Sequence, residues 1–216
     1  MSQAGHRLRR ERMVRDLQAR GIRDRRVLEA MGQVPRHRFV EGTLHQSRAY
    51  SEFALPIGED QTISQPYIVA RTTELLEIDA DSSILEIGTG SGYHTAVLAT
   101  LARRVYSLER IPSLAKGAIR RIRDLGLGNV KIQIFDGTVG WSDVGPFDGI
   151  LVLAGSPKAP PPLLDQLRLG GRLVIPEGGR DRQTLVRYRR LEEGFQREEL
   201  EPVTFVPLIG RHGWEG

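Results

Sequence analysis

The sequence of 216 residues contains no cysteine, and only 6% of its residues are aromatic. Without cysteine there is no disulfide framework, no thiolate metal site and no cysteine nucleophile. No apolar run is long enough to span a membrane, and segment 7–12 is rich in arginine where a signal peptide needs apolar residues. We therefore expect a cytoplasmic protein with no membrane partner and no metal.

The chain is basic, with a net charge of +4 and a sequence pI near 9.7. A basic chain raises the possibility of nucleic-acid binding. Here the arginines are interleaved with Glu and Asp, and no aromatic residues alternate with them to form a stacking platform. The pattern favours a solvated arginine-rich surface over a nucleic-acid partner.

The order of segments predicts an α/β protein. Between residues 61 and 180, short apolar segments alternate with segments of helical periodicity, which is typical of a doubly wound, mostly parallel sheet. Residues 1–60 predict a helical N-terminal extension, and residues 181–216 predict antiparallel strands that complete a substrate site. The length suits one domain with a real core, and we expect a single domain over 1–216 that works as a monomer.

Several elements are predicted in detail. Segment 6–20 predicts a helix with Leu8, Met13, Val14 and Leu17 inward, and Asp24 is expected to cap a second, short helix. The further expected elements are a helix that begins at Ser64 as its N-cap, a helix from Pro112 with Ile119 inward, a helix through 163–167, and strands at 104–109, 130–135, 146–153, 171–176, 184–188 and 203–208.

The apolar segment 83–87 ends in three glycines spaced two apart: Gly88, Gly90 and Gly92. Glycine is needed where a nucleoside lies almost on the backbone, because a Cβ would push the ligand away. A dinucleotide site has Gly or Ala where this chain has Tyr93, so the spacing disfavours NAD. The turn predicts a nucleoside site of another kind.

A second strand ends at Glu109, about 20 residues after the glycine turn, where an acceptor for ribose hydroxyls is expected. The turn and Glu109 together resemble the cofactor site of S-adenosylmethionine-dependent methyltransferases. In those enzymes the position of Glu86 lies near the methionyl end of the cofactor. The alternative for Glu86 is a partly buried strand-end carboxylate that bonds to backbone.

Segment 62–66, Thr-Ile-Ser-Gln-Pro, precedes the glycine turn. With segments 34–40, 136–141, 169–176 and 205–208, it makes almost the whole chain resemble the protein-L-isoaspartate (D-aspartate) O-methyltransferases. The resemblance implies a Rossmann-like class I methyltransferase. It also implies methyl transfer from S-adenosyl-L-methionine, which becomes S-adenosyl-L-homocysteine, to the free carboxyl of isoaspartyl residues in damaged proteins and peptides, with repair through a succinimide.

The resemblance also implies residue roles. Ser64 is the catalytic residue, Thr62 and Val206 help to hold the isoaspartyl substrate, and Asp136 and Gly137 lie at the adenine. The chain departs from the family at two places. Small or neutral residues are common at the positions of Glu59 and Asp60, and glutamine is common at the position of His94.

The chemistry explains why no catalytic base is apparent. An isoaspartyl residue carries a free carboxyl with a pKa of about 3.3–3.7, so the nucleophile is already ionised at neutral pH. Such a carboxylate is best held by neutral hydroxyl or N–H donors, which leave it nucleophilic. Ser64 could supply its hydroxyl to the substrate or only cap the helix that follows, and Thr62 alone would be taken for a loop residue.

Two other functions remain open from the residues. An RNA methyltransferase would usually show an acidic or amide residue followed by Pro-Pro and an aromatic residue after the fourth strand, where segment 153–157 reads Leu-Ala-Gly-Ser-Pro. A non-catalytic binder of damaged proteins or of the cofactor would not need Ser64. A single-turnover assay separates the enzyme from the binder.

Overall fold

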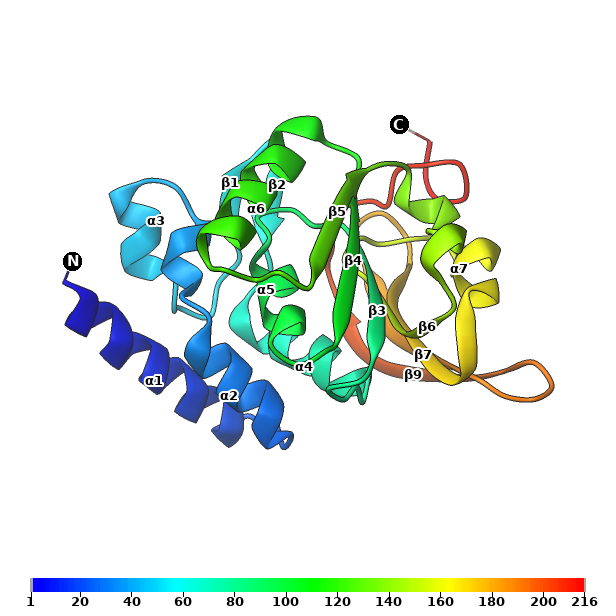
Figure 1. Ribbon diagram of the computed structural model, residues 1–216, viewed down its shortest axis with the longest axis horizontal. Helices are drawn as coiled ribbons and strands as arrows, with labels where there is room; N and C mark the ends of the chain where they lie inside the picture. The colour runs from blue at the N-terminus through cyan, green and yellow to red at the C-terminus, as the bar shows by residue number, and fades with distance from the viewer. Residues whose placement is uncertain (1, 216) are drawn as a thin grey trace.

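The computed structural model describes residues 2–215 and is built around a seven-stranded sheet (Figure 1). The strands are Ser83–Ile87 (β3), Arg104–Glu109 (β4), Val130–Ile134 (β5), Phe147–Val152 (β6), Leu167–Gly178 (β7), Gln183–Arg190 (β8) and Phe195–Val203 (β9). Their order is β5-β4-β3-β6-β7-β8-β9; β3 to β7 pair in parallel, and β8 and β9 form an antiparallel edge. The predicted fold class is confirmed.

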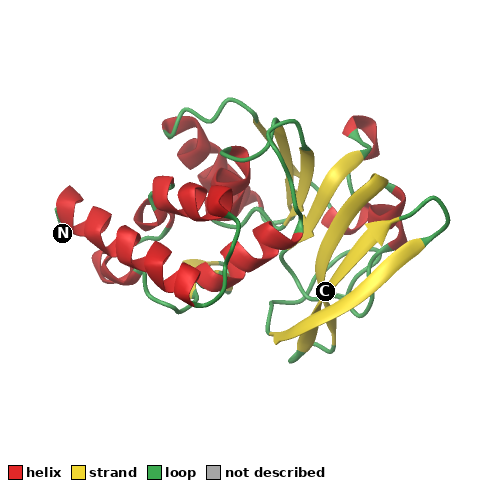
Figure 2. Cartoon of the chain, turned by 90° about the horizontal axis from the view of Figure 1, so that it is seen from below, coloured by secondary structure: helices red, strands yellow, loops and turns green. Residues whose placement is uncertain are grey.

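Helices cover both faces of the sheet. Figure 1 places α4 (Pro66–Leu75), α5 (Tyr93–Ala99) and α6 (Pro112–Asp124) on one side and α7 (Pro161–Asp165) on the other, where the 3₁₀ turns η2 (Gly137–Val139) and η3 (Ser142–Val144) also lie. The N-terminal extension consists of α1 (Gln3–Ala19), α2 (Arg25–Gln33), the 3₁₀ turn η1 (Arg36–Phe39) and α3 (Thr43–Arg48). Figure 2 shows most helices at one end of the molecule and the long strands at the other.

Both faces of the sheet are buried. Successive side chains of a strand point to opposite faces, so each strand contributes to the cores on both sides. Ile84 packs beneath α4 and α5, whereas Leu85 and Ile87 pack toward α7. A further core joins the N-terminal helices to Tyr93 and Val97 of α5. The continuous apolar strands in the sequence therefore reflect a sheet that is covered on both sides.

The predicted burial of Leu8 and Ile119 is wrong. Leu8 is 61% exposed, and the buried face of α1 consists of His6, Met13 and Leu17. Leu8 lies two positions from His6, which is about 200° around a helix and so points to the opposite side. Ile119 of α6 is likewise 43% exposed.

The predicted helix start at Ser64 is also wrong. Helix α4 begins at Pro66 with Gln65 at the N-cap position, and no side chain caps it. Gln65 has φ −55° and ψ 149° because the residue before a proline is driven away from the helical region. Ser64 is therefore held two residues before the helix, and its hydroxyl is not used as a cap.

Thr62 lies in a strand rather than a loop. Strand β2 (Gln61–Ile63) pairs antiparallel with β1 (Leu55–Gly58) in a small hairpin. Glu59 and Asp60 join the strands with φ of 53° and 54°, as a two-residue hairpin turn requires. Ser113 of α6 donates to Glu59 over 2.6 Å, which anchors the turn.

The strand predicted at 203–208 is wrong. β9 covers residues 195–203, and segment 205–209 runs irregularly, with an isolated bridge between Gly155 and Pro207. β9 is a mostly exposed edge strand whose charged sequence hides it from an apolar pattern. The helix predicted at 163–167 lies two residues earlier in the structure, since α7 covers Pro161–Asp165 and Leu167 already begins β7.

Candidate active site

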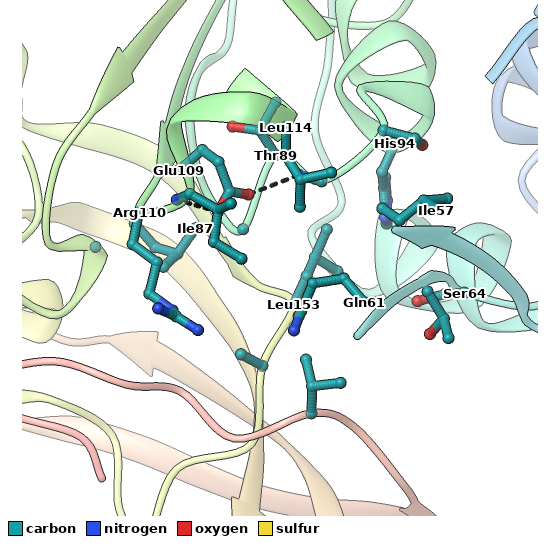
Figure 3. A pocket seen from close by; sticks show the side chains of 18 of the residues that line it. Ile57, Gln61, Ser64, Ile87, Thr89, His94, Glu109, Arg110, Leu114 and Leu153 are labelled. Atoms are coloured by element: carbon teal, nitrogen blue, oxygen red, sulfur yellow. Dashed lines mark hydrogen bonds between the residues drawn. The ribbon is translucent and has the colours of Figure 1, made fainter. Parts of the chain in front are cut away.

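The main cavity lies at the carboxyl ends of β3, β4 and β6 (Figure 3). Here the chain crosses from β4 and β5 on one side of β3 to β6 on the other, which is the place where open α/β sheets bind ligands. The walls come from segments 61–64, 87–91, 108–111, 153–154 and 206–209 and from Gly137.

The glycine turn forms one wall. Gly88, Gly90 and Gly92 have φ of 97°, 52° and 87°, a region that favours glycine. Gly88 and Gly90 line the cavity. Gly92 instead faces α6, where an added Cβ would lie 3.1 Å from the Cβ of Ala118. The first two glycines thus make room for a ligand, and the third lets α5 approach α6.

Glu109 locks the turn in place. Its carboxylate accepts hydrogen bonds from the backbone N–H of Gly90 over 2.8 Å and of Ile111 over 2.9 Å. The side chain is 5% exposed and lines the cavity (Figure 3). Each carboxylate oxygen keeps a further lone pair, so Glu109 can accept from ligand hydroxyls as well.

Glu86 is fully buried behind this wall and does not line the cavity. Its Oε2 accepts from the hydroxyls of Thr95 (2.5 Å) and Ser107 (2.6 Å), and Oε1 has no partner within residues 2–215. Burial raises the pKa of Glu86 to about 7, although the two hydroxyl bonds oppose this rise. Its partners are side chains rather than backbone groups.

Ser64, Thr62 and Val206 line the same cavity as the glycine turn. The hydroxyl of Ser64 makes no hydrogen bond within the described part of the chain. These three residues and Leu153 also line a second pocket, whose other walls include Phe53, Ile68, Arg182 and Phe205. The two pockets therefore meet at Ser64, an arrangement that no sequence pattern signalled.

Arg36 fixes the backbone at Ser64. Its guanidinium is completely buried, lies 4.8 Å over the ring of Tyr93, and donates to the carbonyls of Ala49 (2.6 Å) and Ser64 (2.8 Å). Burial lowers the pKa of Arg36 to about 10, so it stays charged at neutral pH. Sequence reasoning missed this residue, although it belongs to segment 34–40, which resembles the family.

Asp136 and Gly137 follow β5, where Asp136 caps the 3₁₀ turn η2. Gly137 lines the cavity. Asp136 accepts instead from the backbone N–H groups of Thr138 (2.9 Å) and Arg211 (2.8 Å) and from the Thr138 hydroxyl (2.7 Å). Burial acts to raise the pKa of Asp136, but these bonds outweigh it and the net pKa is lowered. Asp136 thus ties the C-terminal segment to the sheet.

His94 lines the cavity. Its Nε2 lies 2.8 Å from the hydroxyl of Thr73, which also lies 2.7 Å from the carbonyl of Val69. Nδ1 has no hydrogen-bond partner within residues 2–215. Burial lowers the pKa of His94 to about 3, which keeps the ring neutral.

Three further histidines, His6, His37 and His45, have structural partners. His37 stacks on His6 with ring centroids 3.8 Å apart and bonds to the hydroxyl of Tyr50 over 2.7 Å, and His45 bonds to the carbonyl of Glu41. Within residues 2–215, no three His, Asp or Glu side chains are grouped as metal ligands, and none of the helices could cross a membrane.

Comparisons with known proteins agree with this geometry. The family model described as protein-L-isoaspartate(D-aspartate) O-methyltransferase (PCMT) matches residues 8–213. Protein-L-isoaspartate O-methyltransferase 1 of Syntrophobacter fumaroxidans is 56% identical over 208 residues, covering 96% of this chain and 97% of that protein. The corresponding protein of Geobacter metallireducens is 54% identical, with 95% of each chain covered.

Solved structures give the same result. A protein-L-isoaspartate O-methyltransferase matches with a TM-score of 0.87 and 27% identity, over 94% of this chain and 67% of that one. A beta-aspartate methyltransferase (PCMT) from Plasmodium falciparum, in complex with S-adenosyl-L-homocysteine, matches with a TM-score of 0.81 and 27% identity, over 93% and 98%.

Proposed function

This chain belongs to the protein-L-isoaspartate(D-aspartate) O-methyltransferase family, and from that premise we propose how its residues divide the work of one reaction. The reaction is the S-adenosyl-L-methionine-dependent methylation of isoaspartyl residues in proteins and peptides. The methyl ester, unlike the free carboxylate, offers methanol as a leaving group. The neighbouring backbone nitrogen can therefore attack the ester carbonyl, expel methanol and close a succinimide, which begins repair.

Gly88, Gly90, Glu109 and Gly137 bind the cofactor in this proposal. The fit is supported by two features of the cavity: glycines at positive φ leave its wall without side chains, and Glu109 is aimed at it with free lone pairs. Bound S-adenosylmethionine supplies a methyl group on a sulfonium cation. Gly92, also predicted to bind the cofactor, acts through α5 by letting the helix approach α6.

Asp136, predicted to bind at the adenine, contributes indirectly. Its hydrogen bonds to Arg211 and Thr138 hold the segment that carries Val206 and the rest of 206–209 against the cavity. We therefore give Asp136 the role of a positioning residue for this wall.

Ser64, Thr62 and Val206 bind the isoaspartyl residue. The substrate carboxylate is ionised at neutral pH and needs no base, so the site has to orient it while leaving its charge available. The hydroxyl of Ser64, free of bonds within residues 2–215, can donate to one carboxylate oxygen. Arg36 holds the Ser64 carbonyl and thereby sets the direction of this hydroxyl without reaching the substrate itself.

One observation carries the proposal: the cofactor cavity and the second pocket share Thr62, Ser64, Leu153 and Val206. A cofactor on one side and a polypeptide on the other would meet at Ser64. This is the arrangement that methyl transfer between a small donor and a protein needs.

Replacement of Ser64 tests the proposal. Because Ser64 does not cap α4, Ser64→Ala should change the free energy of unfolding by no more than about 0.5 kcal/mol. We expect kcat/KM for isoaspartyl peptides to fall by about 10- to 100-fold, or about 1.4–2.7 kcal/mol, with unchanged cofactor affinity. Ser64→Asp should be worse, since it adds an anion beside the substrate carboxylate. Ser142→Ala is the control. Normal turnover in a stable Ser64→Asp protein would end the proposal.

We also propose that the enzyme is a single domain and works as a monomer on protein rather than nucleic acid. The N-terminal helices share a core with Tyr93 and Val97 of the sheet domain. Many arginines are engaged in ion pairs, such as Arg197 with Glu177 and Arg187 with Glu198. The cytoplasmic location stays a prediction from the sequence.

A further inference from the structure

The second pocket contains an exposed aromatic residue. Phe53 lines it and is 72% exposed, the highest exposed fraction among the large apolar side chains of residues 2–215. The pocket continues into apolar side chains, among them Ile68 and Phe205, each less than 10% exposed. Phe53 therefore extends the apolar lining of the pocket out to its mouth.

The same pocket has two charged residues that differ in their surroundings. Glu52 lies 3.5 Å from Arg20, which compensates its charge. Arg182, in the turn between β7 and β8, is exposed and forms no hydrogen bond or ion pair within residues 2–215, although Asp181 is its neighbour in the chain. Arg182 thus leaves the pocket with an uncompensated positive charge.

The acidic residues that distinguish the sequence lie elsewhere. Glu59 and Asp60 occupy the tip of the β1–β2 hairpin, line neither pocket, and Glu59 bonds to Ser113. Glu52 and Arg182 are consequently the charged side chains in the wall of the second pocket.

We propose that the second pocket reads the residues that flank the isoaspartate, with Phe53 binding an apolar flanking side chain and Arg182 favouring an acidic one. The inference rests on the proposed place of the isoaspartate at Ser64. If the isoaspartyl carboxylate reaches Ser64 while the cofactor fills the main cavity, the polypeptide on either side has to leave through the pocket that shares Ser64, Thr62 and Val206. Phe53 and Arg182 then lie along its path.

The test uses one host isoaspartyl peptide in which each flanking position is Leu, Ser, Asp or Lys. Phe53→Ser should raise KM for the Leu-flanked peptide about tenfold, equivalent to about 1.4 kcal/mol, with little change for the Ser-flanked peptide and none in kcat. Phe53→Leu should restore most of the affinity. Phe195→Ser is the matched control, because Phe195 is 36% exposed and lines neither pocket.

Arg182→Glu should reverse the charge preference. We expect the ratio of kcat/KM for Asp-flanked over Lys-flanked peptides to exceed one in the natural protein, to fall by about tenfold in the variant, and to approach one in both near 1 M salt, where the Debye length is about 3 Å. Arg189→Glu, an equal change of charge at an exposed position of β8 outside both pockets, should leave the ratio unchanged.

The outcomes separate this inference from the function on which it rests. The natural protein, Phe53→Ser and Arg182→Glu could all be fully active and show the same ratios of kcat/KM between peptides with different flanking residues. That result overturns the inference but leaves the proposed function in place. If the natural protein methylates none of the isoaspartyl peptides, the proposed function itself has failed.

Discussion

The buried carboxyl of Glu86 predicts that stability decreases as pH rises. Its pKa is raised from the ordinary value of 4.5 to about 7 because burial disfavours the charged form. Below pH 4.5 the group is protonated in both folded and unfolded chains and costs nothing. Above pH 4.5 the unfolded chain ionises the group freely while the folded protein still holds it protonated in the core, so the stability present at low pH is progressively lost, and the loss is complete once the pH has risen through 7.

The magnitude follows from the two pKa values. A difference of about 2.5, at 1.36 kcal/mol for each pH unit, corresponds to about 3 kcal/mol in total. Most of this change, about 2–3 kcal/mol, should occur between pH 5 and 8. Glu86→Gln keeps the shape and an acceptor for the hydroxyls of Thr95 and Ser107 but cannot ionise.

The measurement is urea unfolding of the natural protein and of Glu86→Gln at several pH values from 5 to 8. The natural protein should lose about 2–3 kcal/mol relative to the variant over this range. Constant effects of the substitution, such as an unpaired amide, cancel because only the change with pH is compared. Glu193→Gln, in the exposed turn between β8 and β9, is the control. If the stabilities of Glu86→Gln and the natural protein run parallel with pH, the reasoning is refuted.

Two further predictions concern the site. Glu109→Ala removes the acceptor for the backbone N–H groups of Gly90 and Ile111 and for the ribose hydroxyls of the cofactor. Because each bond is worth about 0.5–1.5 kcal/mol, calorimetry should show that the affinity for the cofactor falls at least tenfold. Unchanged affinity in the folded variant would contradict the assignment. In Arg36→Lys the side chain cannot hold the carbonyls of Ala49 and Ser64 together. We expect kcat/KM for isoaspartyl peptides to fall by about tenfold while the affinity for the cofactor is unchanged. Equal losses in kcat/KM and in cofactor affinity would contradict a positioning role.

The convergence of Gly88, Gly90 and Glu109 on one cavity could be predicted because the information is local. Gly88 and Gly90 follow one apolar strand and Glu109 ends the next, and parallel neighbouring strands bring their carboxyl ends to one edge of the sheet. The alternation of strands and helices predicted the fold class for the same reason.

The other side depends on contacts between distant residues. Arg36 reaches carbonyls 13 and 28 positions away, and nothing in its neighbours announces a buried guanidinium. Proline geometry moved the start of α4 from Ser64 to Pro66, although both are good residues for a helix N-terminus. The second pocket combines segments near 53, 64, 182 and 205, which only the folded chain brings together.

The irregular segment 206–209 has a consequence for synthesis of the protein. It closes the cavity by threading back along the sheet, with Gly155 donating to the Val206 carbonyl and Leu208 donating to the Gly155 carbonyl, each over 2.8 Å. The glycine turn and Ser64 are translated long before this wall. A chain in which residues 206–209 are not yet in place can pair most of its sheet but lacks one wall of the cavity, so the cavity can be completed only after this segment has been translated and has folded back onto Gly155.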